Sequence, residues 1–239
     1  MGVNSNVFFN VLAKDLENAK DIAHLGGTRV FIGLLVKSIP DEKSAIQEVK
    51  LYKDNHIRVS IGLGAGDPNQ WLKVANIAAK TLPDHVNQVF PASAYTLGRL
   101  EETGGKNTII NALIEPSGVP GKVYISTGPR SSDFKEAVSS DMAATMLAEM
   151  GVHSIKFYPI EGDKRLNEVA AMVKSAASAG IKIFEPTGGI TLDNVKKIVE
   201  TCLENGAQIV MPHLYSSIIN KSNGKTDLKA VETLVSLEW

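Results

Sequence analysis

Eight short runs rich in β-branched and aromatic residues alternate with helical patterns along almost the whole chain, and this alternation constrains the fold more than any other feature. The first two runs are VFFNVLA (7–13) and RVFIGLLV (29–36), and the other six cover 57–66, 86–93, 107–115, 154–160, 182–188 and 207–213. Near-continuous apolar runs are typical of parallel strands buried on both faces. Eight strand-and-helix units predict an α/β fold, a single (β/α)8 TIM barrel over residues 1–239, with a doubly wound open sheet as the alternative.

The connection after the fifth run is longer than the others. We expect a loop that contains GVPGKVYISTGPRSSD (118–133), followed by a helix over FKEAVSSDMAATMLAEMG (134–151). Gly and Pro in the first stretch are typical of turns. The second stretch has apolar residues at helical spacing.

Charge and composition exclude several classes of protein. The 25 Lys and Arg residues nearly balance the 26 Asp and Glu residues, so no overall basic excess indicates a nucleic-acid partner. No apolar stretch approaches the ~20 residues of a membrane-spanning helix, and the N-terminal residues do not resemble a signal peptide. The single cysteine, Cys202, excludes an intrachain disulfide and is expected to be an inert core thiol. We therefore expect a soluble, cytoplasmic protein without a membrane or nucleic-acid partner.

The sixth apolar run, within HSIKFYPIEG (153–162), carries a lysine in its middle. Because side chains alternate in direction along a strand, a Lys156 that points into the barrel takes Ser154 and Tyr158 with it. Ile155 and Phe157 then face the helices. Apolar walls lower the pKa of a lysine and make its amine available as a Schiff-base nucleophile. The residues leave open a second interpretation, in which Lys156 binds a substrate carboxylate or forms a structural ion pair.

Paired glycines end the seventh run, in FEPTGGI (184–190), and a helical pattern begins directly after them. Backbone amides at a helix N-terminus bind anions, and barrels often bind phosphate in the loops after strands seven and eight. We expect an anion site, most simply for phosphate, at Gly188 and Gly189. A plain strand-to-helix turn is the alternative.

These two stretches together resemble the 2-keto-3-deoxy-6-phosphogluconate (KDPG) aldolases, class I lyases on a TIM barrel. IKFYPIEG followed by IKIFEPTGGIT is similar to the sixth and seventh strands of that family, and IGLGAGDP and VNQVFPAS are weaker echoes of its third and fourth strands. The longer chain fits a divergent branch of the family in sugar-acid catabolism. The resemblance implies that Lys156 is the Schiff-base lysine, that 187–189 hold the carboxylate or phosphate end of the substrate, and that His213 stands where the family has a phosphate-binding serine. It also implies a homo-oligomer.

The second strand departs from the family pattern. The family carries a Glu there as general acid/base, followed by an Arg, and RVFIGLLVKS has neither in register. Among the carboxylates at strand ends, we rank Glu115 first as the catalytic base, although an ion pair or a bond to a loop amide would also explain it. Glu185 is a further candidate, which we assign to substrate binding. Arg130, in the loop after strand five, is expected either to reach the substrate's phosphate or carboxylate or to lie in solvent.

The remaining histidines do not indicate a metal site. His24, His56, His85 and His153 are expected in or beside helices and turns, and none has a partner at metal-ligand spacing. We therefore expect no metal and no other cofactor. A class II aldolase, with a metal held by Glu115 and Glu185, remains a minor alternative.

The predicted function is a class I aldolase that cleaves 2-keto-3-deoxy-6-phosphogluconate to pyruvate and glyceraldehyde 3-phosphate. Cleavage of 4-hydroxy-2-oxoglutarate is the nearest variant. A phosphosugar isomerase or epimerase would use Lys156 only to bind charge, and a non-catalytic sensor would bind a phosphorylated ligand without turnover. The expected partner is a small-molecule 2-keto-3-deoxy sugar acid.

Overall fold

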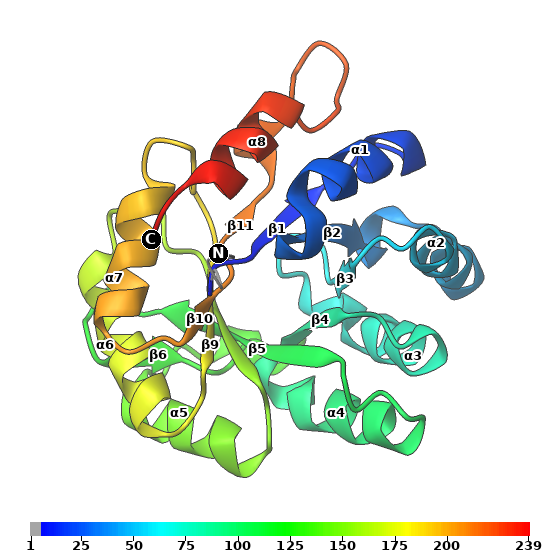
Figure 1. The fold of residues 1–239 in the computed structure, drawn as a ribbon. Helices are drawn as coiled ribbons and strands as arrows, with labels where there is room; N and C mark the ends of the chain where they lie inside the picture. The colour runs from blue at the N-terminus through cyan, green and yellow to red at the C-terminus, as the bar shows by residue number, and fades with distance from the viewer. Residues whose placement is uncertain (1–5) are drawn as a thin grey trace.

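The computed structural model describes residues 6–239, in which parallel strands form a ring with helices packed outside it (Figure 1). The first half contains β1 (Phe9–Leu12), α1 (Leu16–Gly26), β2 (Val30–Leu35), α2 (Glu42–Asp54), β3 (Val59–Gly62), α3 (Trp71–Thr81), β4 (His85–Val89) and α4 (Ser93–Glu102). The second half contains β5 (Ile109–Pro116), β6 (Lys122–Tyr124), β7 (Val138–Ser139), α5 (Ser140–Glu149), β8 (Ser154–Phe157), α6 (Leu166–Ser178), β9 (Ile183–Pro186), α7 (Val195–Glu204), β10 (Ile209–Val210), β11 (His213–Leu214) and α8 (Leu228–Ser236).

The ring closes through its eighth strand, which is divided into β10 and β11. Neighbouring strands follow the order β10-β9-β8-β5-β4-β3-β2-β1-β11, and β10 pairs with β9 while β11 pairs with β1, both in parallel. The amide of Phe8 donates to the carbonyl of Val210 (2.9 Å), and the amide of Asn10 donates to that of Pro212 (3.1 Å). Pro212 has no amide hydrogen, so the strand cannot pair continuously at this point. The predicted TIM barrel is confirmed, and the open sheet is excluded.

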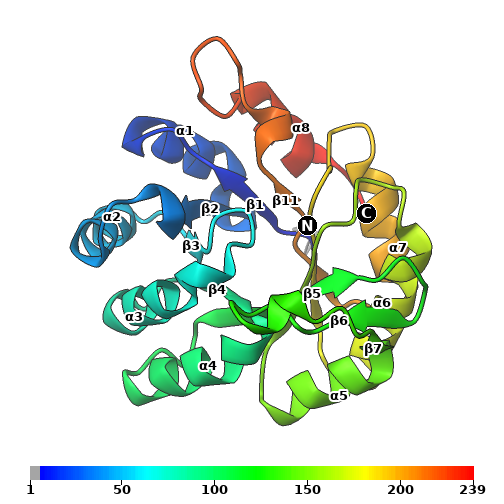
Figure 2. The same ribbon diagram turned by 180° about the vertical axis from the view of Figure 1, so that it is seen from behind.

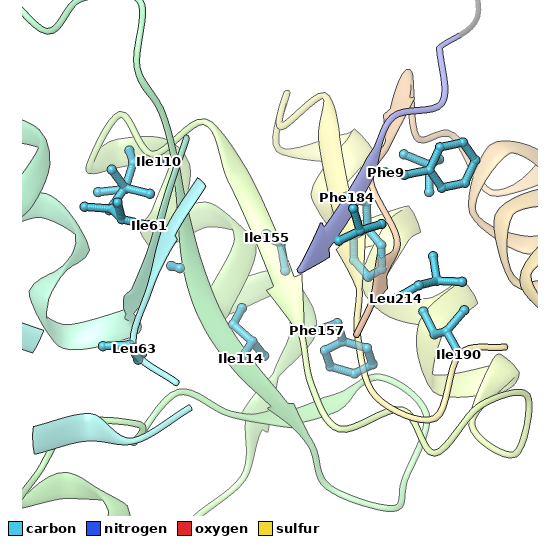
Figure 3. Packing of buried hydrophobic residues seen from close by; sticks show 14 of the residues in the cluster. Phe9, Ile61, Leu63, Ile110, Ile114, Ile155, Phe157, Phe184, Ile190 and Leu214 are labelled. Atoms are coloured by element: carbon cyan, nitrogen blue, oxygen red, sulfur yellow. The ribbon is translucent and has the colours of Figure 1, made fainter. Parts of the chain in front are cut away.

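The main hydrophobic core lies between the ring and the helices. Figure 3 shows Ile155, Phe157 and Phe184 among its buried side chains, and the rings of Phe157 and Phe184 lie 6.0 Å apart. Capping residues fix the points at which the outer helices begin. Asp15 and Asp41, for example, accept backbone hydrogen bonds as N-caps of α1 and α2. Both views of the ribbon show the helices spaced around the ring (Figures 1 and 2).

The long connection after β5 differs from the expected loop and helix. It contains an antiparallel sheet in which β6 pairs with both the end of β5 and β7. The helix begins at Ser140 instead of residue 134, because Ser139 accepts a capping hydrogen bond from the amide of Met142 and the preceding residues are extended in β7. Within residues 6–239, no helix has the length and apolar character that a membrane span requires.

Candidate active site

A cavity of about 570 Å³ opens at the C-terminal ends of the barrel strands. Its walls come from the loops after β3, β8, β9 and β11, and its floor includes Asn87 and Lys156. Five of the predicted site residues line it: Lys156, Thr187, Gly188, Gly189 and His213. The other lining residues are Leu12, Leu35, Gly62, Leu63, Gly64, Ala65, Gly66, Gln88, Leu113, Tyr158, Ile190, Thr191, Tyr215, Ser216, Ser217 and Ile219.

Lys156 lies on β8 and points into the barrel, as the strand alternation predicts. Its Nζ donates to Oδ1 of Asn87 (3.0 Å) and lies 3.2 Å from Nδ1 of His213. Burial lowers the pKa of the Lys156 amine, the charge of Glu185 raises it in part, and the result is a pKa of about 8. A substantial fraction of the amine is therefore neutral near physiological pH, while the apolar neighbours Ile155 and Phe157 lie on the other face of the strand.

Glu185, on β9, is the carboxylate at the centre of the barrel. Four side chains converge on it: His85 Nε2 (3.0 Å) and Ser154 Oγ (2.5 Å) meet Oε1, and His213 Nε2 (2.9 Å) and Asn111 Nδ2 (2.6 Å) meet Oε2. Burial raises the pKa of this carboxyl group, but the charge of His85 and the hydrogen bonds from His213 and His85 outweigh burial and hold the pKa well below its usual value. Glu185 is therefore an anion with donors on both oxygens.

This placement does not support the predicted contact between Glu185 and the substrate. The side chain is fully buried and does not line the cavity. A phosphate or carboxylate would also be repelled by it, because both carry negative charge. Its direct contacts are with protein side chains, and one of these, His213, lies beside Lys156.

His213 connects the buried carboxylate to the lysine. Because an ionised carboxylate only accepts hydrogen bonds, Nε2 of His213 carries the hydrogen that faces Glu185. In the neutral ring, the lone pair is then on Nδ1, which faces both Nζ of Lys156 and the hydroxyl of Tyr215 (3.2 Å). Burial, followed by the charge of Lys156, lowers the pKa of His213 to about 3, so the ring is neutral at physiological pH. His213 is the first residue of β11 and lines the cavity.

Asn87 holds the amine from the other side. Its Nδ2 donates to Oγ of Ser60 (3.0 Å) and to the carbonyl of Ile61 (3.0 Å), which leaves Oδ1 for Lys156 and for Nδ2 of Asn111 (3.0 Å). The orientation of this amide is thus fixed by its neighbours. An acceptor at this position binds the lysine but is too weakly basic to take its proton.

The expectation for His85 is wrong. It is the first residue of β4 and lies inside the barrel, where Nδ1 is 2.8 Å from Oγ of Ser60 and Nε2 faces Glu185. Ser60 also accepts from Nδ2 of Asn10 (2.7 Å), and Oδ1 of Asn10 accepts from Tyr215 (3.3 Å). These contacts form a closed circuit of polar side chains, which Lys156 joins through His213 and Asn87.

Sequence reasoning missed most of this circuit, although a signal for it was present. His85, Asn87 and Asn111 interrupt apolar strands at positions separated by two residues or aligned with neighbouring strands. Polar residues on such a strand need hydrogen-bond partners, and for His85, Asn87 and Asn111 these partners lie inside the barrel. The same argument that found Lys156 thus applies to the other strands.

The loop after β9 brings backbone close to the cavity. Gly188 (φ 102°) and Gly189 (φ 72°) both adopt the left-handed region. A Cβ on Gly189 would lie 2.6 Å from the amide nitrogen of Gly162, so this position also requires glycine for packing. Asn194 ties the loop to α7, since it accepts from the amide of Thr191 (2.8 Å). Among the described residues, the amide of Gly189 makes no hydrogen bond with the protein.

The structure does not bring Glu115 or Arg130 to this cavity. Glu115 pairs with Lys135 (2.9 Å) at the antiparallel sheet, and neither residue lines the cavity. Arg130 is exposed and lines a separate hollow with Trp71 and Tyr95. The base role of Glu115 and the substrate contact of Arg130 are therefore unsupported. Glu115 lies where the end of β5 pairs with β6, and Arg130 lies in the connection between β6 and β7.

Several solved structures have folds similar to this one over nearly the whole chain. N-(5'-phosphoribosyl)anthranilate isomerase from Pyrococcus furiosus has a TM-score of 0.57 at 14% identity over 96% of both chains. KGPDC from Streptococcus mutans has a TM-score of 0.55 at 15% identity, covering 95% of this chain and 94% of the other. Orotidine 5'-monophosphate decarboxylase from Methanocaldococcus jannaschii has a TM-score of 0.57 at 13% identity, covering 95% and 96%. At these identities the likeness concerns the fold alone.

Closer similarity is found at the level of sequence. A 2-dehydro-3-deoxy-phosphogluconate aldolase from Salmonella typhimurium (strain 14028s / SGSC 2262) is 48% identical over 221 residues, which cover 92% of this chain and 90% of the relative. The family model described as KDGP aldolase matches residues 3–222. Both matches include the barrel strands that carry Lys156, Glu185 and His213. This chain belongs to the KDGP aldolase family.

Proposed function

We propose that this protein is a class I aldolase that cleaves 2-keto-3-deoxy-6-phosphogluconate to pyruvate and glyceraldehyde 3-phosphate through a Schiff base on Lys156. Membership of the family and the name of the 48% identical relative support the reaction and the substrate. The observation that carries the proposal for this chain is the Lys156 amine, which lies on the floor of the cavity with a pKa of about 8. An amine that is partly neutral at working pH is a competent nucleophile toward a keto group.

The chemistry follows from the position of that amine. Attack of Nζ on C2 of the substrate forms the carbinolamine, and loss of water gives an iminium at C2. The iminium accepts the electron pair of the C3–C4 bond as this bond breaks, while the C4 hydroxyl gives up its proton and becomes the aldehyde carbonyl. Protonation of the resulting enamine at C3, followed by hydrolysis, releases pyruvate and restores Lys156.

The loop that contains Thr187, Gly188 and Gly189 supports binding of an anionic end of the substrate. Gly189 lies in the cavity wall with an amide that has no hydrogen bond within residues 6–239, and α7 begins a few residues later with Asn194 as its N-cap. Lys156 is the cationic side chain among the cavity-lining residues. If it carries the iminium, the phosphate is held by amides and by hydroxyls such as those of Ser216 and Ser217, instead of by an arginine.

The proposal includes the assembly and location expected from the sequence, a homo-oligomer in the cytoplasm. Eight large apolar side chains are exposed on the described chain, Phe134 among them. Such side chains are common on monomers too, so mass measurement in solution decides this part. A monomer at micromolar concentration would contradict it without affecting the chemistry.

Borohydride reduction in the presence of pyruvate tests the Schiff base. We expect the intact mass to increase by one reduced pyruvate adduct and peptide mapping to locate the adduct on Lys156. Lys156→Ala and Lys156→Arg should abolish both adduct and aldol cleavage, whereas the exposed-site control Lys50→Ala should retain them. Cleavage activity without any adduct between pH 6 and 9 would exclude the class I mechanism and favour a metal-dependent aldolase. Absence of cleavage with isomerase activity would favour the phosphosugar isomerase.

A further inference from the structure

The ring of His213 joins the reacting amine to a buried anion. Nε2 lies 2.9 Å from Oε2 of Glu185 and Nδ1 lies 3.2 Å from Nζ of Lys156. Glu185 is held by three other donors and has no freedom to turn away, because both of its oxygens are engaged. The bare nitrogen of the neutral imidazole is therefore fixed toward the amine.

Among the described residues, Nζ of Lys156 has only one neighbour that is able to take its proton. Its hydrogen-bond partners are Oδ1 of Asn87 and Nδ1 of His213. An amide oxygen is a poor base, whereas imidazole is the common acid–base group of enzymes. Glu115, the carboxylate that the sequence ranked first, is paired with Lys135 outside the cavity.

We propose that His213 is the catalytic acid–base of Schiff-base formation at Lys156, and that Glu185 is the positioning residue that fixes its tautomer. This inference rests on the proposed aldolase function. Nδ1 of His213 first accepts a proton from the ammonium group of Lys156. The freed amine attacks C2. As the C–N bond forms, the protonated ring gives its Nδ1 proton to the carbonyl oxygen, and Nδ1 then takes a proton from the substrate-bound nitrogen. The hydroxyl of the carbinolamine then leaves as water with the proton that His213 holds, so no net proton is gained or lost.

The charges around His213 fit this cycle. Lys156 on β8 and His85 on β4 face the ring, the two imidazole centroids being 6.2 Å apart, and both oppose a positive charge on it. Glu185 on β9 favours that charge, and Tyr215 contacts Nδ1 with its hydroxyl. When the proton moves from Lys156 to His213, the opposing charge of the lysine disappears at the same moment. The resulting imidazolium lies against the carboxylate of Glu185, which stabilises it.

Trapping kinetics test the proposal in the full-length protein. The rate constant for reduced-adduct formation with pyruvate is measured in the wild type, in His213→Asn and in His213→Ala, with His24→Ala, an exposed histidine on α1, as the control. We expect both His213 variants to form the adduct about 100-fold more slowly. Added imidazole should restore much of the rate in His213→Ala, with a pH dependence that follows the pKa of free imidazole, and should restore nothing in Lys156→Ala.

The outcomes separate this inference from the proposed function. No adduct in the wild type would overturn the Schiff base itself. If the wild type forms the adduct and folded His213→Asn forms it at a rate within about threefold of the wild-type rate, only the role of His213 would be overturned. Slow trapping in folded His213→Ala that imidazole does not accelerate would indicate a structural role and would also overturn it.

A measurement on the wild type protects the test against variants that fail to fold. Nitrogen chemical shifts of the histidine rings report which nitrogen carries the hydrogen. The proposal requires His213 to have its hydrogen on Nε2 and a bare Nδ1 at pH 7. A ring with the hydrogen on Nδ1 would overturn the proposal, whatever the variants do.

Discussion

Nζ of Lys156 lies 3.2 Å from Nδ1 of His213, although 57 positions separate the two residues in the chain and their strands are not neighbours in the ring. β9 lies between them and contributes Glu185 to the same cluster. The site is thus built across three strand positions of the barrel. Substitutions on any of these strands should change the chemistry in different and measurable ways.

The rate of adduct formation should depend on pH through the Lys156 amine. The pKa of this group is about 8, and only the neutral amine attacks the keto group. We expect the trapping rate with pyruvate to rise up to about pH 8 and then level off, and to be about 100-fold lower at pH 6 than on the plateau. A profile that keeps rising toward pH 10.5 would show that burial does not lower the pKa.

Lys156→Met should stabilise the fold below pH 8. The pKa of Lys156 is lower in the folded chain than its ordinary value of 10.5, so the unfolded chain binds more protons between pH 8 and 10.5. The free energy of unfolding of the wild type therefore rises with pH across that window. Below pH 8 the full destabilisation by the buried Lys156 ammonium is present. We expect the advantage of the variant in urea unfolding to shrink by on the order of 2 kcal/mol from pH 7 to pH 11, after allowance for exposure to the cavity. A constant difference would contradict the expectation.

Glu185→Gln should impair both stability and catalysis. The carboxylate accepts from four donors, and an amide in its place turns an NH₂ group toward some of them. We expect a loss of about 3 kcal/mol in urea unfolding and a fall in kcat of about 100-fold, with a smaller change in KM. A variant that keeps wild-type kcat would show that the tautomer of His213 does not matter.

Glu115→Gln serves as the comparison on the surface. Its ion pair with Lys135 is partly exposed, with side-chain exposures of 29% and 53%, and such pairs contribute ~0–1 kcal/mol. We expect kcat/KM within twofold of the wild type and little change in Tm. A large fall in kcat would restore Glu115 as the base and would count against His213.

Gly189→Ala should disturb the loop after β9, which we propose binds the anionic end of the substrate. Gly189 has a φ of 72°, which an alanine rarely adopts, and the new Cβ would lie 2.6 Å from the amide nitrogen of Gly162. We expect Tm to fall and KM for the phosphorylated substrate to rise more than tenfold. Gly180→Ala is the matched control, because its φ is 84° but no atom lies within 4 Å of the Cβ. Equal effects of the two substitutions would show that backbone strain alone is responsible.

Sequence patterns predicted the barrel and the lysine because both depend on local order. The apolar runs that became β2 and β8 have the length and composition of buried parallel strands. Alternation along β8 then placed Lys156 and Ser154 inside, where their contacts with His213 and Glu185 are found. The lysine could be found without knowledge of its partners.

The partners themselves depend on register between strands, which a single sequence does not specify. Glu115 ends an apolar run as an inward catalytic carboxylate would, yet β5 continues past it into the antiparallel sheet. The apolar run predicts a strand that begins at residue 86, although His85 is the first residue of β4 and faces Glu185. Whether a strand extends by one more residue at its end determines whether the side chain of that residue points into the barrel.

The division of the eighth strand at Pro212 also has a consequence for synthesis on the ribosome. β1 is made first and β9 much later, and each pairs with a different half of that strand. Until residues 209–214 leave the exit tunnel, both strands have an open edge with unpaired backbone groups, which is a surface for aggregation. Slow translation or truncation before this segment should therefore increase the demand for chaperones. Once residues 209–214 have been synthesised and have paired with β9 and β1, the two open edges are covered.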